Sequence, residues 1–220
     1  MFLILLLVTL AALISATPQA TVASASTLSA YDTSATTAPN FRLVADVISD
    51  DLEPSIQGWA ISSYHIGACL GVAVVVPNTP DRTRAFYVNG TTADVRDGAG
   101  NILSDGGTPP IPYGFVVSQA DQTDDQGRRA VRINCGPGSP GVSLSHSTKH
   151  AHLTYHEGSV ETRFGAWYAC NTSLPFGPAM VLYYRSRGEN TPEGCAELRL
   201  QPEWWVRRSF LSTCALLTLV

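Results

Sequence analysis

A short histidine-rich segment contains the residues whose type and spacing come nearest to a metal site. Four histidines fall within eleven residues, at His146, His150, His152 and His156, and Glu157 follows directly. If residues 149–156 form one strand, its period of two places His150, His152 and His156 on the same face. Zinc and copper accept such a pair of imidazoles, and a metal held there could activate water for hydrolysis. Because Glu157 alternates to the other face, we favour the alternative of imidazoles that bind nothing, and we predict no metal and no cofactor.

Carboxylates and aromatic rings offer a second chemistry, the cleavage or binding of polysaccharide. A carboxylate pair for glycoside hydrolysis would come from Asp94, Asp97, Asp105, Glu157 or Glu161. The separation that such a pair needs is spatial, so the sequence does not select one. Four aromatic residues could stack on sugars, namely Trp59, Tyr113, Trp167 and Tyr168, although aromatic residues in strands more often pack in the core. His65 stands alone between Tyr64 and Ile66, and we expect a hydrogen-bonded core histidine there.

Five cysteines are scattered along the chain, at Cys69, Cys135, Cys170, Cys195 and Cys214, and none forms a CxxC pair. In an exported chain such cysteines are expected to form disulfides and not to bind zinc. Cys170 and Cys195 lie at the ends of neighbouring predicted strands, and Cys135 shares a face with Val131 and Ile133, where Cys69 could meet it. We therefore predict Cys170–Cys195 and Cys69–Cys135, each stabilising by about 3 to 4 kcal/mol, with Cys214 left over. The alternative leaves Cys69 and Cys135 as small buried apolar residues.

The two ends of the chain differ in composition from the part between them. Residues 2–14 are an uncharged apolar run followed by small residues, which predicts a secretory signal over residues 1–20, cleaved between residues 16 and 25. Thirteen residues are too few for a membrane anchor. Residues 21–40, rich in Ser, Thr and Ala, predict a disordered leader. Residues 204–220 end in an apolar tail that is also too short to span a bilayer. As a GPI signal it would remove a predicted strand, so we favour a poorly ordered tail.

Length and charge limit the class of protein and its partners. A chain of 220 residues fits one domain with a sizeable core, which we place at residues 41–203. Charged residues make up 15% of the chain, against about 25% in average soluble domains. The formal net charge is −4 and Lys149 is the only lysine. Nucleic acid and anionic membranes need basic patches, so neither a nucleic-acid partner nor stable membrane insertion is expected.

From Phe41 onward, short runs of β-branched and aromatic residues alternate with Gly, Pro, Asn and Asp. About ten short strands and no useful amphipathic helix predict an all-β fold, an antiparallel β-sandwich resembling a jelly roll. The segment Ala196–Gln201 shows the clearest alternation of apolar and polar residues. We expect Asn101–Pro110 to be a shaped loop in which Asp105 caps a turn, and Lys149–Tyr155 to be a strand. Only Asp51–Ile56 could form a helical turn.

Two sequons for N-glycosylation lie at predicted strand ends, where a glycan could project into solvent. They begin at Asn89 and Asn171. Since the chain carries a predicted secretory signal, we expect at least one of them to be occupied.

Several ordered motifs between Phe41 and Leu200 carry a family resemblance. They are Phe41–Ala45, Ser62–Ala68, Phe86–Thr91, Asn101–Pro109 and Asn134–Gly138. Together they resemble a family of small secreted fungal proteins known as a domain of unknown function. The resemblance implies secretion, a fungal source and a β-rich fold, and it implies no reaction. We therefore expect a secreted, extracellular glycoprotein that is not an enzyme and binds cell-wall carbohydrate or a host surface. The alternative is a secreted polysaccharide hydrolase that depends on a metal or a carboxylate pair.

Overall fold

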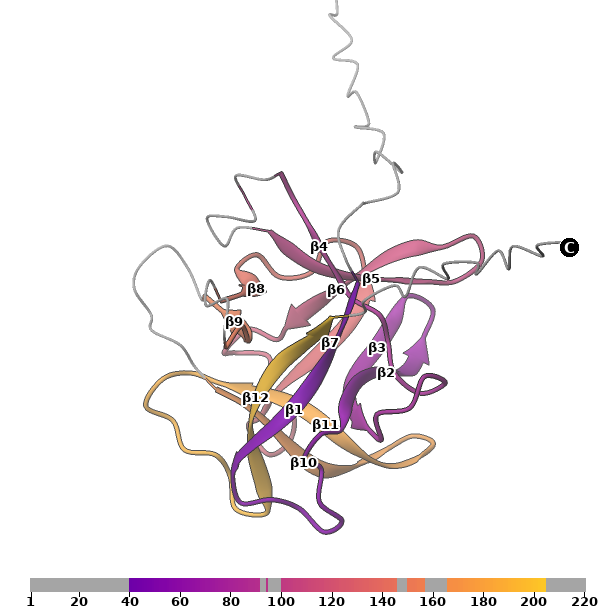
Figure 1. Cartoon of the computed structure of the whole chain (residues 1–220). Coiled ribbons are helices and arrows are strands. Elements are labelled where there is room, and N and C mark those ends of the chain that lie inside the picture. The colour runs from indigo at the N-terminus through magenta and orange to yellow at the C-terminus, as the bar shows by residue number, and fades with distance from the viewer. Residues whose placement is uncertain (1–39, 92–93, 95–99, 146–149, 157–165, 205–220) are drawn as a thin grey trace, which may run out of the picture. The chain divides into compact units, whose positions relative to one another are not determined.

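The computed structural model describes residues 40–91, 94, 100–145, 150–156 and 166–204 (Figure 1). Every strand pairing in this part of the chain is antiparallel, and the predicted all-β fold is confirmed, with twelve strands where about ten were expected. The strands are β1 (Phe41–Ser49), β2 (Ala60–Gly67), β3 (Leu70–Val76), β4 (Tyr87–Asn89), β5 (Asn101–Gly106), β6 (Ile111–Val117), β7 (Arg129–Cys135), β8 (Val142–Leu144), β9 (Leu153–Tyr155), β10 (Ala166–Leu174), β11 (Gly177–Arg185) and β12 (Cys195–Trp204).

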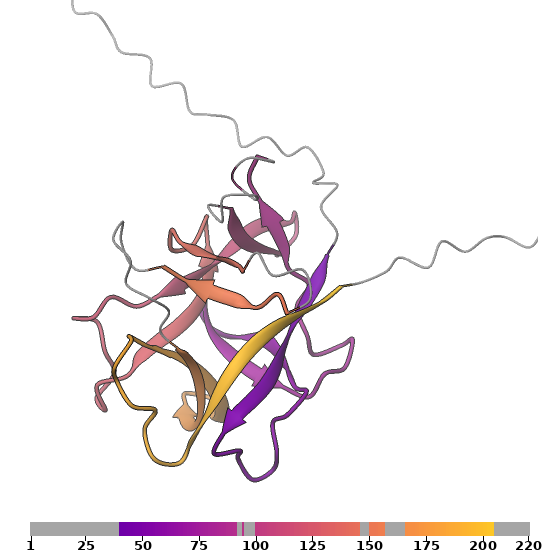
Figure 2. The same cartoon turned by 60° about the vertical axis from the view of Figure 1, so that its left-hand side comes forward.

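Six of these strands pair in a closed ring. β1 pairs with β2 and β12, β3 pairs with β2 and β11, and β10 pairs with β11 and β12. β10 and β11 form a long hairpin that runs from Ala166↔Arg185 to Leu174↔Gly177. Figure 2 shows β12 lying along β1, and β10 separates β12 from β11 in the ring. Ring closure is a property of pairings between strands far apart in sequence, which the period of two does not predict.

Four of the remaining strands extend the ring, and β8 and β9 pair with each other in a separate two-stranded sheet. β7 pairs with both β3 and β11 and leads into β6, β5 and β4, while Phe86 bridges back to Phe41 of β1. Asn101–Gly106, expected to be a loop, is strand β5, because Ile102 and Leu103 are buried in the sheet. The glycines and prolines that suggested a loop form the turn that follows this strand. Asp105 caps no turn here; its Oδ1 accepts a hydrogen bond from the Tyr87 hydroxyl.

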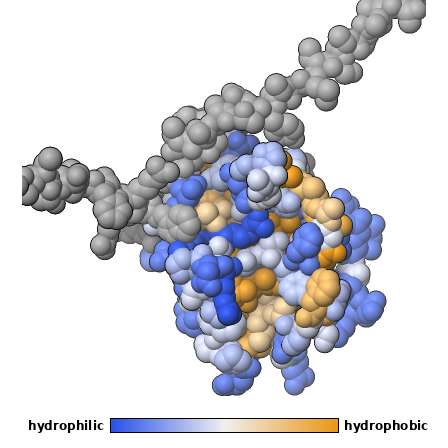
Figure 3. All heavy atoms as spheres, turned by 90° about the vertical axis from the view of Figure 1, so that its right-hand side faces the viewer, coloured by the Kyte–Doolittle hydropathy of each residue, from blue (hydrophilic) through white to orange (hydrophobic). Residues whose placement is uncertain are grey.

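Alternation along the strands separates two apolar clusters. In β10, Trp167 and Ala169 lie in the main core with Leu198 of β12, whereas Tyr168 and Cys170 lie in a smaller cluster on the other face. Each large aliphatic or aromatic side chain buried in this way contributes roughly 1.5 to 3 kcal/mol. Six large hydrophobic residues stay exposed among the described ones, and the face in Figure 3 shows hydrophobic patches between hydrophilic ones. The six exposed hydrophobic residues are Ile48, Ile66, Leu70, Ile111, Phe176 and Trp204.

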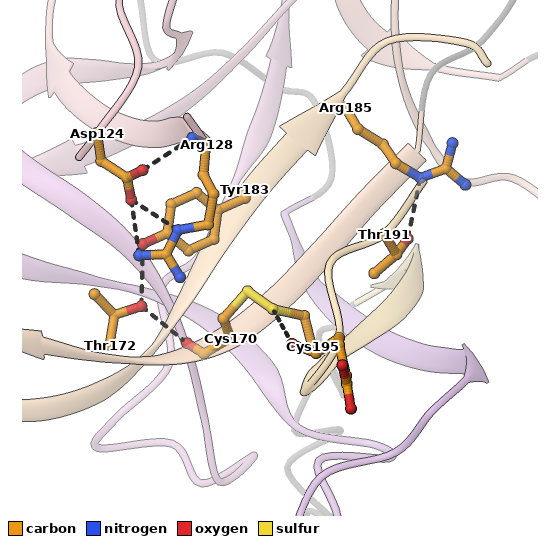
Figure 4. The surroundings of a disulfide bond; sticks show 9 residues. Asp124, Arg128, Cys170, Thr172, Tyr183, Arg185, Thr191 and Cys195 are labelled. Carbon is orange, nitrogen blue, oxygen red and sulfur yellow. Dashed lines mark hydrogen bonds and ion pairs between the residues drawn. A yellow bond between two sulfur atoms is a disulfide. The ribbon is translucent and has the colours of Figure 1, made fainter. Parts of the chain in front are cut away.

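Both disulfides that we predicted are present in the structure. Cys170 and Cys195 are directly opposite on β10 and β12, with Cα atoms 4.4 Å apart (Figure 4). Cys69, in the turn between β2 and β3, is joined to Cys135 at the end of β7, with Cα atoms 5.0 Å apart. The two bonds therefore tie strands that come together only after folding. Cys214 lies outside the described residues.

Several other predictions concern residues outside the described ranges. The signal peptide, the leader and most of the apolar tail fall there. Within the described ranges, no helix reaches the length and apolarity needed for a membrane crossing. Residues 51–56 form an irregular turn instead of a helical one, because the Asp51 carboxylate accepts hydrogen bonds from the Ile56 amide and the Ser55 hydroxyl.

Candidate functional site

Two pockets of similar size each bring arginine and acidic residues together. The first, here called the arginine pocket, has a volume of about 270 Å³ and is walled by parts of β1, β9, β10, β11 and β12. Its walls include His152, Trp167, Arg185, Arg187, Glu197 and Arg199. The second, here called the Arg84 pocket, has a volume of about 300 Å³ and lies beside β4 and β5. Arg84, Tyr87, Ser104 and Asp105 line it.

Strand register places the charged residues of the arginine pocket. Arg185 of β11 is directly opposite Ala166 of β10, and Trp167 of β10 is opposite Leu198 of β12. The antiparallel register therefore brings Arg199 close to Ala166 from the other side. Trp167 is buried, and its indole N–H donates to the Leu153 carbonyl at 2.8 Å, which attaches β9 to the floor of the pocket. Arg185 and Arg199 thus lie on either side of Ala166, and the buried Trp167 forms the apolar floor of the pocket.

Arg185 is held by interactions within the chain. Its Nη2 lies 2.7 Å from Glu197 Oε2, its Nε donates to the Thr191 hydroxyl at 3.0 Å (Figure 4), and its Nη1 donates to the Glu189 carbonyl at 2.7 Å. Burial by itself would raise the pKa of Glu197. Hydrogen bonds from Arg185 and Thr191, with the charge of Arg185, outweigh it and lower that pKa below the ordinary value. Glu197 therefore stays ionised and fixes Arg185 at the pocket wall.

The other two arginines of the pocket are much less engaged. Arg199 Nη1 lies 3.8 Å from Asp46 Oδ2, and both side chains are well exposed, so water competes for this ion pair. Arg187 is exposed and has no hydrogen-bond or ion-pair partner among the described residues. Three arginines and one glutamate give the lining a formal charge of +2, on a chain whose formal net charge is −4. The pocket is therefore suited to an anion.

In the Arg84 pocket the polar groups satisfy one another. Arg84 Nε donates to the Ser104 hydroxyl at 2.9 Å, its Nη2 donates to the Asp105 carbonyl at 3.0 Å, and its guanidinium lies 5.2 Å from the Tyr113 ring centroid. The Tyr87 hydroxyl donates to Asp105 Oδ1 at 2.8 Å. Burial and this hydrogen bond raise the pKa of Tyr87 above its ordinary value. Tyr87 therefore remains a neutral donor, and the cluster holds β5 beside the segment that leads into β4.

The three described histidines of the segment do not share one strand face, and His146 and Glu157 lie outside the described residues. β9 spans only Leu153–Tyr155, so His150 and His152 precede the strand and His156 follows it; the prediction of one strand face was wrong. The strand begins late because both the His152 amide and its Nδ1 lie 3.0 Å from the Ser145 hydroxyl, which draws this residue into the turn. The described residues hold no group of three His, Cys, Asp or Glu that could bind a metal ion. His152 instead lines the arginine pocket.

The structure also places the other candidates. His65 is exposed on β2 and is not the core residue expected, because its neighbours on β3 leave that position at the surface. Trp167 and Tyr168 are buried, and Trp59 and Tyr113 are half-buried and pack against the main core. Asp94 accepts hydrogen bonds from Thr91, as Asp105 does from Tyr87. Asp97, Glu157 and Glu161 lie outside the described residues. The sequon residues Asn89 and Asn171 are exposed.

Sequence reasoning missed the four charged residues of the arginine pocket. Glu197 and Arg199 belong to the alternation of β12, which indicated only a solvent face. Arg185 is the last residue of β11, and Arg187 follows it in the next turn. The available signal was the spacing Arg-x-Arg beside a strand end in a chain with few charges. This spacing does not identify a site by itself, because the arginines meet Glu197 and Arg199 only once β10 pairs with both β11 and β12.

Comparisons with known proteins agree with the fold and with the motifs. Residues 38–204 match the model of a family described as a domain of unknown function (DUF7907). The antigenic protein SchS34 of Stachybotrys chartarum is 31% identical over 180 residues, which covers 76% of this chain and 76% of that protein. No solved structure matches. The family resemblance predicted from the motifs is thus confirmed, and the chain belongs to the DUF7907 family.

Proposed function

We propose that this protein is a secreted fungal protein that acts without catalysis, by binding carbohydrate of a cell wall or a host surface through the arginine pocket. The observation that carries the proposal is the arrangement of charged side chains at that pocket. Arg185 of β11 and Glu197 of β12 are fixed to each other across β10, while Arg187, in the turn after β11, and Arg199 of β12 remain available to a ligand. Charged groups held on rigid strands are preorganised for binding.

Secretion is supported by the covalent framework and by the relative. Two disulfides are typical of proteins that fold in an oxidising compartment. The apolar run at residues 2–14 has the length of the hydrophobic region of a signal peptide, and the exposed Asn89 and Asn171 suit N-glycosylation. The name of the fungal relative, an antigenic protein, is what is expected of a protein that meets a host outside the cell.

Binding is tested with the protein purified from culture medium and a panel of fungal-wall, plant-wall and host-surface polysaccharides. We expect at least one polymer to retain the protein. Arg187→Ala should weaken that retention, and Arg82→Ala, which removes an exposed turn arginine outside the arginine pocket, should not. Retention by no polymer contradicts the proposal. Release of reducing sugar from any polymer contradicts its non-catalytic part.

Secretion is tested by expressing the full chain in a fungal host and analysing the medium by mass spectrometry. We expect protein that begins between residues 17 and 26 and loses mass on enzymatic removal of N-glycans. Asn89→Gln and Asn171→Gln then identify the occupied sequon, since each variant lacks one acceptor. Protein that remains in the cells with its first twenty residues contradicts secretion.

A further inference from the structure

We infer that the arginine pocket recognises a carboxylate, and that its ligand class is acidic polysaccharide built from uronic acid residues. The inference rests on the proposed function and names the chemistry of its ligand. Some carbohydrates of a cell surface carry negative charge and others are neutral. The charge of the pocket therefore decides which class it accepts.

The positive charge of the pocket lining favours an anionic polysaccharide over a neutral one. The lining carries a formal +2, whereas the whole chain carries −4. A positive pocket on a negative chain attracts anions to this place while the rest of the molecule repels them. A neutral glucan would gain no charge attraction from Arg187, which has no described partner, or from Arg199, whose only ion pair among the described residues is the loose one with Asp46.

One arginine of the pocket is engaged within the chain, and the other two can contact a ligand. Arg185 uses Nε, Nη1 and Nη2 on Thr191, Glu189 and Glu197. Arg187 is exposed without a described partner, and the 3.8 Å contact of Arg199 to Asp46 is loose. A guanidinium offers paired donors that match the two oxygens of a carboxylate. Arg187 and Arg199 together can therefore hold a carboxylate at the mouth of the pocket.

The rest of the pocket fits a sugar ring better than a small free anion. Its volume of about 270 Å³ is near the lower end for ligand pockets, which suits one ring and not a large molecule. Ile48, 51% exposed at the rim, offers an apolar contact to the C–H groups of a ring. Glu197 keeps acceptor positions beyond those that Arg185 and Thr191 occupy, and these can accept sugar hydroxyls. Carboxylate, hydroxyls and C–H groups occur together in a uronic acid residue.

The test measures retention by two pairs of immobilised polymers, and the members of each pair share a sugar backbone and differ in charge. The probes are polygalacturonate, its fully methyl-esterified form, a sulfated glucan and the same glucan without sulfate. We expect polygalacturonate to bind and esterification to abolish binding, because the ester removes the negative charge. Arg187→Ala and Arg199→Ala should each weaken binding about ten- to hundredfold, as expected for hydrogen bonds to a charged group. Arg82→Ala serves as the matched control and should leave binding unchanged, and raised salt should weaken all binding.

Arg187→Ala is the decisive variant, because Arg187 has no described contact whose loss could disturb the fold. Circular dichroism verifies that each variant is folded. Equal binding of the esterified polymer or of the neutral glucan, still weakened by Arg187→Ala, would overturn the inference and leave the proposed function standing. Binding that Arg187→Ala does not affect would overturn both, because the proposed function places the ligand in the arginine pocket. Binding of the sulfated glucan alone would overturn the choice of carboxylate. Binding of no polymer would overturn the proposed function itself.

Discussion

The arginine pocket and the Arg84 pocket have similar volumes and similar residue types, yet their polar groups are used differently. Arg84 directs two donors to Ser104 and to the Asp105 carbonyl, and Tyr87 completes the cluster. In the arginine pocket only Arg185 is so engaged, while Arg187 and Arg199 remain accessible to solvent. A charged cluster that satisfies its own hydrogen bonds stabilises the fold. A cluster that leaves donors accessible can bind a ligand.

A third arginine cluster, near the Cys170–Cys195 disulfide, supports this distinction. The Arg128 guanidinium lies 4.4 Å from the Tyr183 ring centroid and pairs with Asp124 at 2.7 Å (Figure 4). Arg128 is buried, and the Asp124 carboxylate also accepts the amides of Gln126 and Arg128. Like Arg84, this arginine has its donors occupied within the chain, so we assign it to the fold.

The largest expected effect is on stability, from Arg84→Ala. This change leaves the Ser104 hydroxyl, only 1% exposed, and the Asp105 carbonyl without their donor. An unsatisfied buried group costs about 1 to 3 kcal/mol, so we expect the free energy of unfolding to fall by that amount. Urea denaturation measures it, with Arg82→Ala as control. If Arg84→Ala instead left stability unchanged and abolished retention by the polysaccharides, the roles of the two pockets would be reversed.

Tyr87→Phe should have a smaller effect in the same direction. It removes the hydroxyl that donates to Asp105 Oδ1 and keeps the ring, at a cost of about 0.5 to 1.5 kcal/mol. Asp105 is exposed, so water replaces part of the lost hydrogen bond and the value should lie near the lower end. Urea denaturation measures it again. A loss greater than that of Arg84→Ala would show that Tyr87 and not Arg84 organises the cluster.

The ion pair of Glu197 with Arg185 should make the free energy of unfolding depend on pH. The pKa of Glu197 is lowered in the folded state, so its contribution is present above the ordinary carboxyl pKa of about 4.3 and is lost as pH falls through the lower folded value. Urea denaturation of the protein and of Glu197→Gln should therefore differ at pH 6 and converge towards pH 3. Exposed Glu193→Gln is the matched control. A difference that grows as pH falls would contradict the ion pair with Arg185.

The smallest expected effect on stability belongs to Arg187→Ala. An exposed residue without a described partner should change the free energy of unfolding by no more than about 0.5 kcal/mol. Thermal or urea denaturation verifies this, beside Arg84→Ala as the contrasting variant. A loss of 1 kcal/mol or more would place Arg187 with the structural arginines and remove the difference between the two pockets.

Local patterns accounted for much of the fold and for none of the charged site. Alternation predicted β12 and the face on which Cys135 lies, and from these the disulfide partners followed. Asn101–Gly106 was misread because the glycines and prolines after it determine a turn and not the preceding strand. His150, His152 and His156 were grouped by spacing alone. In the structure the His152 amide donates to the Ser145 hydroxyl, and β9 begins only after His152 and ends before His156.

Sequence by itself determined the strand class, the period-two core and the covalent framework, because each depends on near neighbours or on the redox conditions that scattered cysteines imply. Tertiary structure alone decided that β10 lies between β11 and β12, which assembles Arg185, Arg187, Glu197 and Arg199 around one pocket. Such a site depends on pairings between segments far apart in the chain. The hydrophobic pattern of each strand is compatible with many partners, and only the closed ring selects the partners that form this pocket.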